Sequence, residues 1–450
     1  MFVPAAEDDQ GRSSSLDVVS YDLAVDLTHG PETFWSRSEV RFRCRHAGAS
    51  TFADVQTASI RRATLNGADL DITARRAAGR LVLPRLADNN ILTVEAEFAY
   101  TSASAGLHYV TDPDDGRACV FSKCYPHGAP RIYCCFDEPD LRAPFTVSVQ
   151  APAGWSCLAN APVISRPLEG DPGRWRFALT DPIPPWLSSL CVGPYSGSAL
   201  RCQRDGRDPL PVTIQAVPSA ATDLEPSRIL DLLRRSLRYY ERNLGVPYPY
   251  AKCDLVFVPG LEALAYSVPG LIVIQDQVLK SQPAPSAYYL AAVIAHEFAH
   301  AWIGGLVAMR SWEDMWLDEA LTTYLSRTAL AEIFPGMTPW EASTSASLPD
   351  DAYAGDAKAV RELEDLIGRH AVIGGLGTLL RRNAHGSATR EDLVRCWSQA
   401  SGRDLGDWAA TTLVRWSAPA EAERMPGRVR VDLVPLGRLD VIGRLEQLGP

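Results

Sequence analysis

The chain has 450 residues, of which 46% are hydrophobic and 22% are charged. Two domains are expected at this length, and the composition excludes an intrinsically disordered chain. The formal net charge is −10, which repels phosphate backbones and anionic lipid and therefore argues against nucleic acid and membranes as partners.

The sequence has the features expected of a cytoplasmic protein. No run approaches the roughly 18 apolar residues of a membrane span, and the N-terminal segment MFVPAAEDDQGRSSS is polar and acidic where an export signal would be basic and then apolar. The ten cysteines are therefore expected to stay reduced. Cys134 and Cys135 are neighbours, with Cys119 and Cys124 just before them, so a second metal or a redox pair stays open as an alternative.

Alternating apolar residues indicate strands through roughly the first 200 residues. The pattern is clearest at Leu23, Val25 and Leu27; at Val40, Phe42 and Cys44; at Leu92, Val94, Ala96 and Phe98; and at Phe145, Val147 and Val149. This half is predicted to be a largely antiparallel β domain.

Helical spacing replaces this pattern after Val217, first between Ile229 and Leu244, where Gly245 ends the run. Further helices are predicted over 286–304, 317–334, 389–402 and 404–416, the third opened by a capping box of Thr389 and Asp392. Short strands are predicted over 255–258, 271–274 and 429–433. The predicted class is α+β, divided into a β domain (1–205), a mainly helical domain (206–420) and a short tail (421–450).

The motif His296-Glu297-Phe298-Ala299-His300 lies within the predicted helix 286–304. Residues four apart project from one face of a helix, so both imidazoles can bind one metal ion. Glu319, on the next predicted helix, is the expected third ligand. Two histidines and one glutamate leave a fourth position for water, which is typical of a catalytic rather than a structural zinc site.

The predicted cofactor is therefore one Zn²⁺ per chain. Zinc lowers the pKa of bound water and polarises a carbonyl, and Glu297 is predicted to take the water proton as general base. The alternative is that two histidines fell four apart on a core helix by chance, and the suitably spaced Glu319 weakens that alternative.

The segment IAHEFAHAWIGGLVAMRSWEDMWLDEALTTYLS resembles the core of the aminopeptidase N family of zinc metallopeptidases, which also contains a leukotriene epoxide hydrolase. Further similar segments, in family order, are FDEPDLRAPF, AGWSCLANAPV and YYERNLGVPYPYAKCDLVFVP. The resemblance extends from Tyr21 to Trp416. It implies a saddle-like antiparallel β domain followed by a thermolysin-like zinc catalytic domain, with the ligands and Glu297 in the roles given above.

The resemblance also implies two features beyond the zinc site. The family has a further helical domain over its active site, and only about thirty residues follow the resemblance here, so we expect a more open cleft that a homo-oligomer or a partner chain would cover. The family also stabilises its oxyanion with a tyrosine on a later helix. Counting back without gaps from GSATREDLVRCWSQASGRDLGDW assigns this role to Tyr353, and the alternative is a surface tyrosine in a loop.

The motifs with which aminopeptidases of this family bind a free α-amino group differ here. Ser267 stands where the family's Gly-Ala-Met-Glu-Asn motif has its glutamate, and Glu262 lies five positions earlier, so that it replaces this anchor only if the local register shifts. Lys123 and Tyr125 stand where a Gln-x-Glu-Pro motif has its two polar anchors. A cation at Lys123 repels a protonated amine and favours a carboxylate or another electron-rich group; the alternative is a surface lysine.

An intact catalytic set with altered anchors leads to our main hypothesis, a zinc hydrolase that cleaves an amide or peptide bond without requiring a free N-terminus. Its substrate would be a peptide or a small amide-containing molecule. The second hypothesis is an ordinary aminopeptidase in which Glu262 or another acid replaces the lost anchors. The third is a zinc enzyme of specialised metabolism that acts on a non-peptide bond, such as an epoxide. A non-catalytic binding protein is the least supported hypothesis, because the expected zinc ligands and Glu297 are all present.

Overall fold

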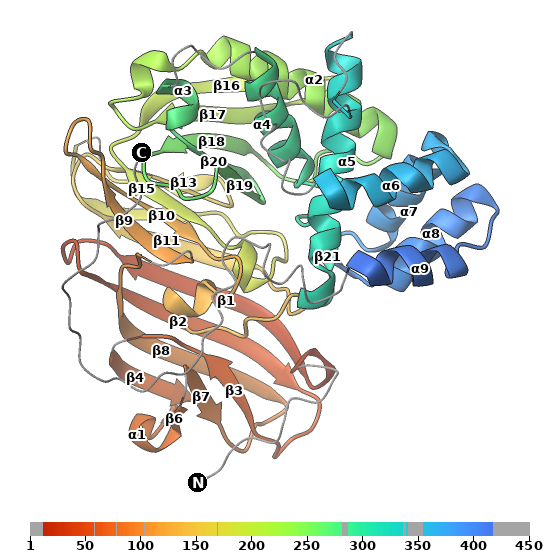
Figure 1. Cartoon of the computed structure of the whole chain (residues 1–450). Coiled ribbons are helices and arrows are strands. Elements are labelled where there is room, and N and C mark those ends of the chain that lie inside the picture. Colours follow the sequence, from red (N-terminus) through yellow and green to blue (C-terminus); the bar gives the residue numbers. More distant parts are fainter. Residues whose placement is uncertain are drawn as a thin grey trace, which may run out of the picture.

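The protein consists of a β-rich half followed by a sheet that is covered by helices (Figure 1). The predicted α+β class, with a β domain before a mainly helical one, is confirmed. The computed structural model describes residues 12–57, 59–77, 79–102, 105–168, 170–280, 287–335, 339–340 and 354–416.

An eight-stranded sheet forms most of the N-terminal domain, shown in red and orange in Figure 1. Its neighbours pair antiparallel except β1 and β11, which pair in parallel from Tyr21↔Phe145 to Asp26↔Gln150. The apolar residues of the alternating pattern are buried, as at Leu23. The strands in order across the sheet are β13 (Val163–Ser165), β14 (Gly173–Phe177), β11 (Phe145–Ala151), β1 (Leu16–Asp26), β2 (Thr33–Cys44), β8 (Asn89–Ala99), β4 (Ser59–Leu65) and β5 (Ala68–Asp69).

Two smaller sheets and the short helix α1 (Ile72–Arg75) complete this half. The three-stranded sheet contains β3 (Thr51–Asp54), β7 (Arg80–Leu83) and β6 (Arg76–Ala77). The four-stranded sheet contains β12 (Ser156–Ala159), β15 (Leu190–Gly193), β10 (Ala118–Lys123) and β9 (Gly106–Thr111). The last residue of β10 is Lys123, so this sheet delivers one of the predicted substrate-binding residues.

A five-stranded sheet begins the second half. Its strands in order are β16 (Ser196–Arg204), β17 (Arg207–Ala216), β18 (Cys253–Val258), β20 (Leu271–Gln275) and β19 (Ala265–Val268). The predicted strands over 255–258 and 271–274 are thus confirmed. The predicted division at 205/206 falls in the turn of the β16–β17 hairpin. Strand pairing therefore puts the change from one sheet to the next between Gly193 and Ser196.

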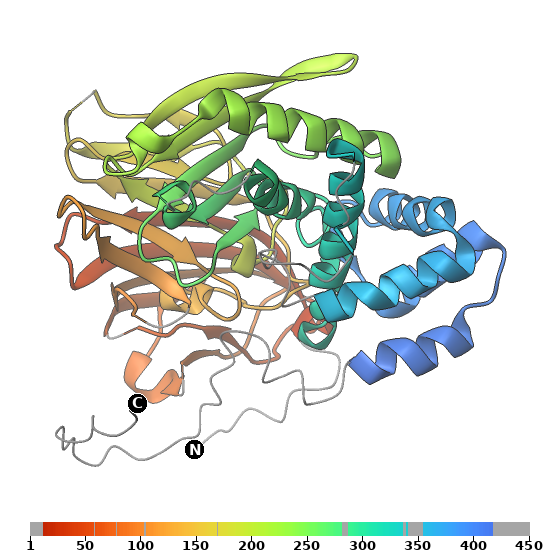
Figure 2. The same cartoon turned by 45° about the horizontal axis from the view of Figure 1, so that its top comes forward.

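Helix α2 (Pro226–Leu244) confirms the first predicted helix. Its apolar residues at helical spacing, from Ile229 to Leu244, are buried, and Gly245 ends it in the left-handed conformation, with φ of 63°. Figure 2 shows α2 running alongside the five-stranded sheet, and it packs against β16 and against the helix that carries the zinc motif.

The four further predicted helices occur in the predicted order, and three helices that were not predicted lie over 277–280, 354–367 and 369–382. Figure 1 shows the last four helices at one side of the molecule. The capping box of Thr389 and Asp392 opens α8, as predicted. The predicted strand over 429–433 and the tail lie outside the described residues. The helices are α3 (Gln277–Lys280), α4 (Ala287–Ala299), α5 (Trp316–Ile333), α6 (Ala354–Ile367), α7 (Arg369–Arg382), α8 (Arg390–Ser401) and α9 (Gly406–Trp416), and a two-stranded sheet of β21 (Val307–Met309) and β22 (Gly386–Ala388) lies between them in the chain.

One continuous cluster of buried apolar residues extends from Leu16 to Leu413 and joins the two halves. Polar contacts also cross between them: the Asn160 amide donates to the Pro269 carbonyl (3.0 Å), and the Lys252 ammonium donates to the Ala159 carbonyl (2.7 Å). Among the described helices, none has the length and apolar character needed to cross a membrane.

Candidate active site

Helices α4 and α5 bring the three predicted ligands together. His296 lies in the last turn of α4, and His300 directly follows the end of this helix. The helix ends at Ala299, earlier than the end at residue 304 that the sequence predicted. Helix α4 is apolar on nearly all sides and is buried against α2 and α5, which holds its end in one position. Glu319 comes from the first turn of α5.

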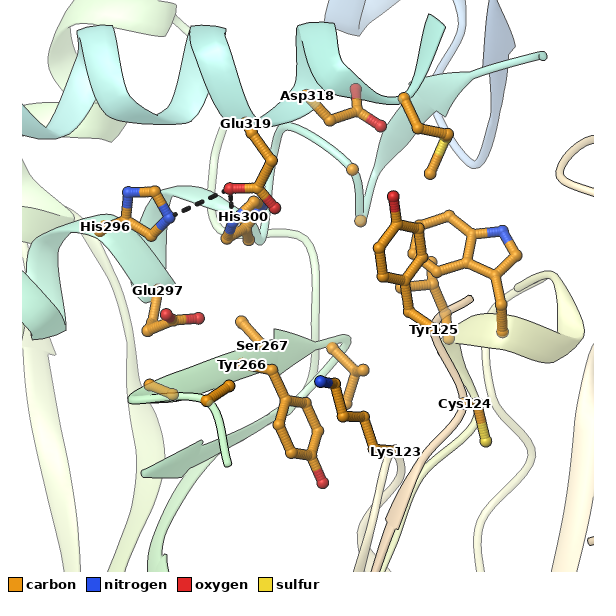
Figure 3. Close-up of a pocket in the computed structure, with 18 of the residues that line it drawn as sticks. Lys123, Cys124, Tyr125, Tyr266, Ser267, His296, Glu297, His300, Asp318 and Glu319 are labelled. Atoms are coloured by element: carbon orange, nitrogen blue, oxygen red, sulfur yellow. Dashed lines mark ion pairs between the residues drawn. The ribbon is translucent and has the colours of Figure 1, made fainter. Parts of the chain in front are cut away.

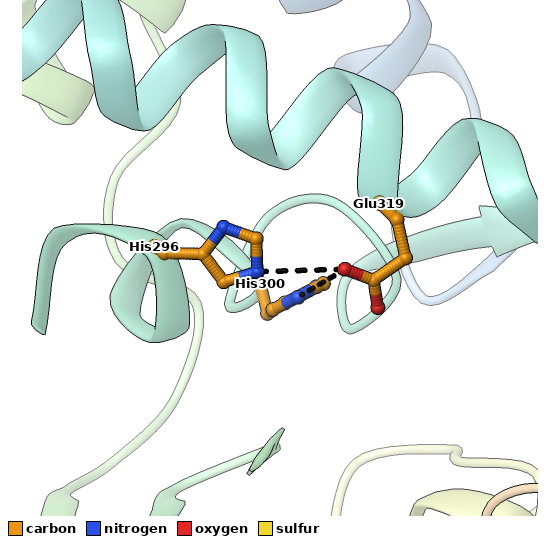
Figure 4. A group of neighbouring side chains, drawn as sticks. All are labelled: His296, His300 and Glu319. Atoms are coloured by element: carbon orange, nitrogen blue, oxygen red, sulfur yellow. Dashed lines mark ion pairs between the residues drawn. The ribbon is translucent and has the colours of Figure 1, made fainter. Parts of the chain in front are cut away.

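The ligand atoms of this group converge (Figure 4). The Glu319 Oε2 atom lies 3.4 Å from His296 Nε2 and 3.6 Å from His300 Nε2, and the three donor atoms all lie within 4.8 Å of one another. Zinc bonds of about 2.0–2.2 Å in a tetrahedron separate neighbouring ligand atoms by about 3.3–3.6 Å. The spacing and the two-nitrogen, one-oxygen donor set therefore fit a zinc ion.

The backbone of the turn that follows helix α4 orients the His300 side chain. Its Nδ1 donates to the Ile303 carbonyl oxygen at 3.2 Å, and the Thr322 hydroxyl lies 3.4 Å from the same nitrogen. A carbonyl oxygen can only accept, so Nδ1 carries the proton and Nε2 is left as the atom that faces Glu319. Such a contact fixes both the tautomer and the orientation of a metal-binding imidazole.

Glu319 and His300 shift each other's pKa. Burial alone would raise the pKa of Glu319, but the charges and hydrogen bonds of His300 and His296 outweigh it and hold this pKa well below its usual range. Burial lowers the pKa of His300, whereas the charge and hydrogen bond of Glu319 raise it, and the net direction is upward. The neighbouring carboxyl of Asp318 has a pKa raised to about 7 by burial, against a lowering hydrogen bond from the Met309 amide.

Glu297 shares a cavity of about 260 Å³ with these residues. Its side chain is 7% exposed, and Figure 3 shows its carboxylate pointing into the cavity beside the His296, His300 and Glu319 group. A carboxylate held here can accept a proton from a reacting group between it and Glu319.

Three of the four predicted substrate-binding residues line the same cavity. Lys123 comes from the end of β10, Tyr125 follows two residues later, and Ser267 lies on β19. Figure 3 shows them on the side of the cavity that faces Glu297 and the histidines. Glu262 is exposed and does not belong to the described lining. Tyr353, predicted as oxyanion stabiliser, lies outside the described residues.

The cavity also has an aromatic and apolar wall that the sequence did not indicate. Trp186 lines it together with Tyr125, their ring centroids lying 5.5 Å apart, and Trp312 packs behind both. Trp186 lies in the short helical turn Pro185–Leu187, which Pro184 precedes. No spacing signal marks it, because its place in the same cavity as Met315 of the second half depends on the packing of the two halves.

Contacts between the halves also support the lining. The Tyr266 hydroxyl on β19 donates to the Ser122 carbonyl, next to Lys123. The buried Arg142 guanidinium donates to the Gly305 carbonyl at 3.0 Å, just after the zinc motif, and burial lowers the pKa of Arg142 to about 10. The cavity is therefore assembled by both halves.

Comparisons with known proteins agree with this arrangement. Residues 18–187 match the Peptidase M1 N-terminal domain, and residues 228–358 match the Peptidase family M1 domain. Aminopeptidase N of Streptomyces lividans is 32% identical over 443 residues, covering 90% of this chain and 51% of that protein. Leucyl aminopeptidase of Saccharolobus solfataricus is 24% identical over 420 residues, covering 86% of this chain and 52% of that protein.

The chain spans about half the length of these curated relatives. Both family domains occur in the same order as the two halves of the fold, and the similarity to aminopeptidase N runs through nearly the whole chain. The chain therefore belongs to the aminopeptidase N family, peptidase family M1.

Proposed function

We propose that the protein is a zinc metallohydrolase that cleaves an amide or peptide bond and does not require a free α-amino group in its substrate. His296, His300 and Glu319 hold the zinc ion in this proposal, and their donor spacing supports it. Bound zinc supplies a Lewis acid that polarises a carbonyl oxygen and activates water at neutral pH.

Glu297 is the general base in this proposal. Its carboxylate takes a proton from the attacking water and passes that proton to the nitrogen of the leaving group. The location supports this role, because the side chain is nearly buried and lines the same cavity as the three ligand candidates. Tyr353 stays a prediction for the hydrogen bond to the developing oxyanion.

A peptide substrate is supported by strand β19. It is the edge strand of the five-stranded sheet, pairs on one side with β20, and lines the cavity with residues Ala265–Val268. An edge strand offers backbone donors and acceptors to an extended peptide, which then adds to the sheet as a further strand.

The proposed change in specificity is supported by the positions of the carboxylates in the cavity. Among the described lining residues, the carboxylates belong to Glu297, Asp318 and Glu319, all of them on the two helices of the zinc site. The opposite side presents Ser267, Tyr125 and the cation of Lys123. A protonated α-amine on that side would meet a positive charge and no counter-charge in the described lining, which disfavours its binding.

Matched substrates test this proposal directly. We expect the zinc-loaded protein to cleave an N-acetyl peptide at least as fast as the same peptide with a free N-terminus, measured as kcat/KM by mass spectrometry of the products. A strong preference for the free amine would contradict the proposal.

Such a preference would instead support an ordinary aminopeptidase, the activity named for several relatives. That function requires a relocated anchor, and Glu262 is the residue to test. Loss of free-amine cleavage in Glu262→Gln, with N-acetyl cleavage unchanged, would assign the amine contact to Glu262. Its exposure and its position outside the described lining argue against this role.

A further inference from the structure

Lys123 is a cation inside the cavity without a counter-ion there. Among the described residues that line the cavity it is the only lysine or arginine, and Figure 3 shows its ammonium group directed into the space opposite His296 and Glu319. Within the described part of the chain, the Lys123 ammonium makes no hydrogen bond or ion pair. A half-buried ammonium loses part of its hydration, and only a partner can restore that free energy.

The surroundings of Lys123 contain little negative charge. Glu262 is the carboxylate whose charge acts on Lys123, and it is exposed to solvent and outside the lining. The ring of His108 on β9 is close enough for the charge of Lys123 to act on it, and burial together with that charge lowers the pKa of His108 to about 4. His108 is therefore neutral at pH 7 and adds no second positive charge beside Lys123.

The neighbouring wall is neutral as well. Ser267 and Tyr125 present hydroxyl groups that can donate to an anion, and Trp186, Leu187 and Met315 present apolar surface. This part of the cavity therefore combines one cation, neutral donors and apolar walls. An apolar pocket with a single cation suits an organic anion better than a neutral or cationic group.

We propose that the cavity takes an amide substrate that carries a carboxylate, and that Lys123 pairs with this carboxylate while the scissile amide lies at Glu297. This inference rests on the proposed amide hydrolysis and specifies its substrate class. The carboxylate can come from the acyl group on the N-terminal side of the scissile bond or from the C-terminus of a short peptide. Lys123 acts here as a specificity residue and takes no part in the proton transfer.

The test uses four peptides of one apolar sequence, with an N-acetyl or N-succinyl group at one end and an amide or a free carboxylate at the other. Binding is measured by calorimetry on the zinc-loaded Glu297→Gln protein, so that affinity is obtained without turnover. We expect one carboxylate-bearing peptide to bind at least about tenfold tighter than the N-acetyl amide, the gain of one charge-assisted hydrogen bond in a partly desolvated site. The end that gives the gain identifies the source of the carboxylate.

In the protein that carries both Glu297→Gln and Lys123→Gln, this difference in affinity between the peptides should disappear. Adding Lys123→Glu instead should reverse the difference, so that the uncharged N-acetyl amide binds tighter than the carboxylate-bearing peptides. Lys358 is exposed on α6, away from the lining, so adding Lys358→Gln, which removes the same charge elsewhere, should leave the difference unchanged. Circular dichroism spectra of all variants check that each one is folded.

Equal binding of all four peptides, no binding of the acidic ones, or a difference that survives Lys123→Gln would overturn the inference. The proposed amide hydrolysis is tested separately, by cleavage of the N-acetyl amide with the unsubstituted protein. Cleavage without any preference for a carboxylate would leave that proposal standing and remove only this one.

Discussion

Glu297, His300 and Lys123 contribute to one cavity, yet Lys123 comes from the β half of the chain and the other two come from the zinc motif. The two glutamates of the site differ in what surrounds them. Glu319 lies within ion-pair distance of both histidines, whereas Glu297 faces the cavity from the side of α4. Their removal should therefore have different consequences for metal binding and for turnover.

Glu297→Gln should lower kcat by about 10²- to 10⁴-fold, because the amide keeps the shape of the side chain but cannot accept the water proton. Zinc content, measured by elemental analysis, should stay at that of the unsubstituted protein. Glu313→Gln is the matched control, since Glu313 is exposed on a neighbouring turn and lies outside the lining. Near-normal turnover in Glu297→Gln would exclude this glutamate as the base.

At the scale of the elements, helix α7 has two adjacent glycines with opposite surroundings. A Cβ atom at Gly374 would meet no heavy atom within 4 Å, whereas a Cβ at Gly375 would lie 2.5 Å from Trp397 Cδ1 and 3.2 Å from the Trp397 backbone on α8. The close approach of α7 to α8 therefore depends on Gly375 and does not depend on Gly374.

Gly374→Ala should raise the free energy of unfolding by about 0.5–1 kcal/mol, because alanine loses less conformational entropy in a helix. Gly375→Ala should lower it by about 1–3 kcal/mol, because the added methyl group overpacks the contact with Trp397. Urea unfolding followed by circular dichroism measures both. The same sign for the two variants would show that α7 and α8 do not pack as closely as described.

At the scale of the whole molecule, Asn160 joins the two halves. Its amide donates to the carbonyls of Leu187 (2.9 Å) and Pro269 (3.0 Å), and its side-chain oxygen accepts from the Ser189 amide (2.8 Å). The side chain is 8% exposed, so water cannot replace these bonds without rearrangement. The bond to Pro269 lies at the start of the turn that separates β19 from β20.

Asn160→Asp keeps the shape of the side chain and removes both donors, and it should lower the free energy of unfolding by about 2–3 kcal/mol. Asn89→Asp, at an exposed position at the start of β8, should change it by less than about 0.5 kcal/mol. Chemical unfolding measured by tryptophan fluorescence tests this. A small effect at Asn160 would mean that the contact between the halves does not depend on this amide.

Zinc should stabilise the whole fold, because its ligands come from two helices that pack against each other. At a free concentration of about 100 times its dissociation constant, a bound ion adds roughly 2.7 kcal/mol. Removing zinc with a chelator should therefore lower the Tm measured by calorimetry, and adding zinc back should restore it. In His296→Ala, the Tm should respond to neither treatment. If the chelator leaves the Tm of the unsubstituted protein unchanged, metal binding at His296, His300 and Glu319 would be contradicted.

The elements were largely predictable from the sequence because their signals are local. Alternation along β1, β2, β8 and β11 and the helical spacing of α2 depend only on side-chain periodicity. The predicted division at 205/206 falls within the β16–β17 hairpin, because in the sequence this hairpin of the second sheet looks like one more pair of strands after the first sheet. Strand pairing decides that membership, and periodicity contains no information about partners.

By itself the sequence determined that His296 and His300 approach one another, because side chains four residues apart lie on the same face of a helix, and it placed Glu297 directly beside this pair in the chain. The tertiary structure decided what surrounds them. It brings Glu319 to within 3.6 Å of both histidines, places Lys123, Tyr125 and Trp186 across the cavity, and leaves Glu262 at the surface. These positions depend on the packing of strands and helices that are far apart in the chain, and local spacing does not specify such packing.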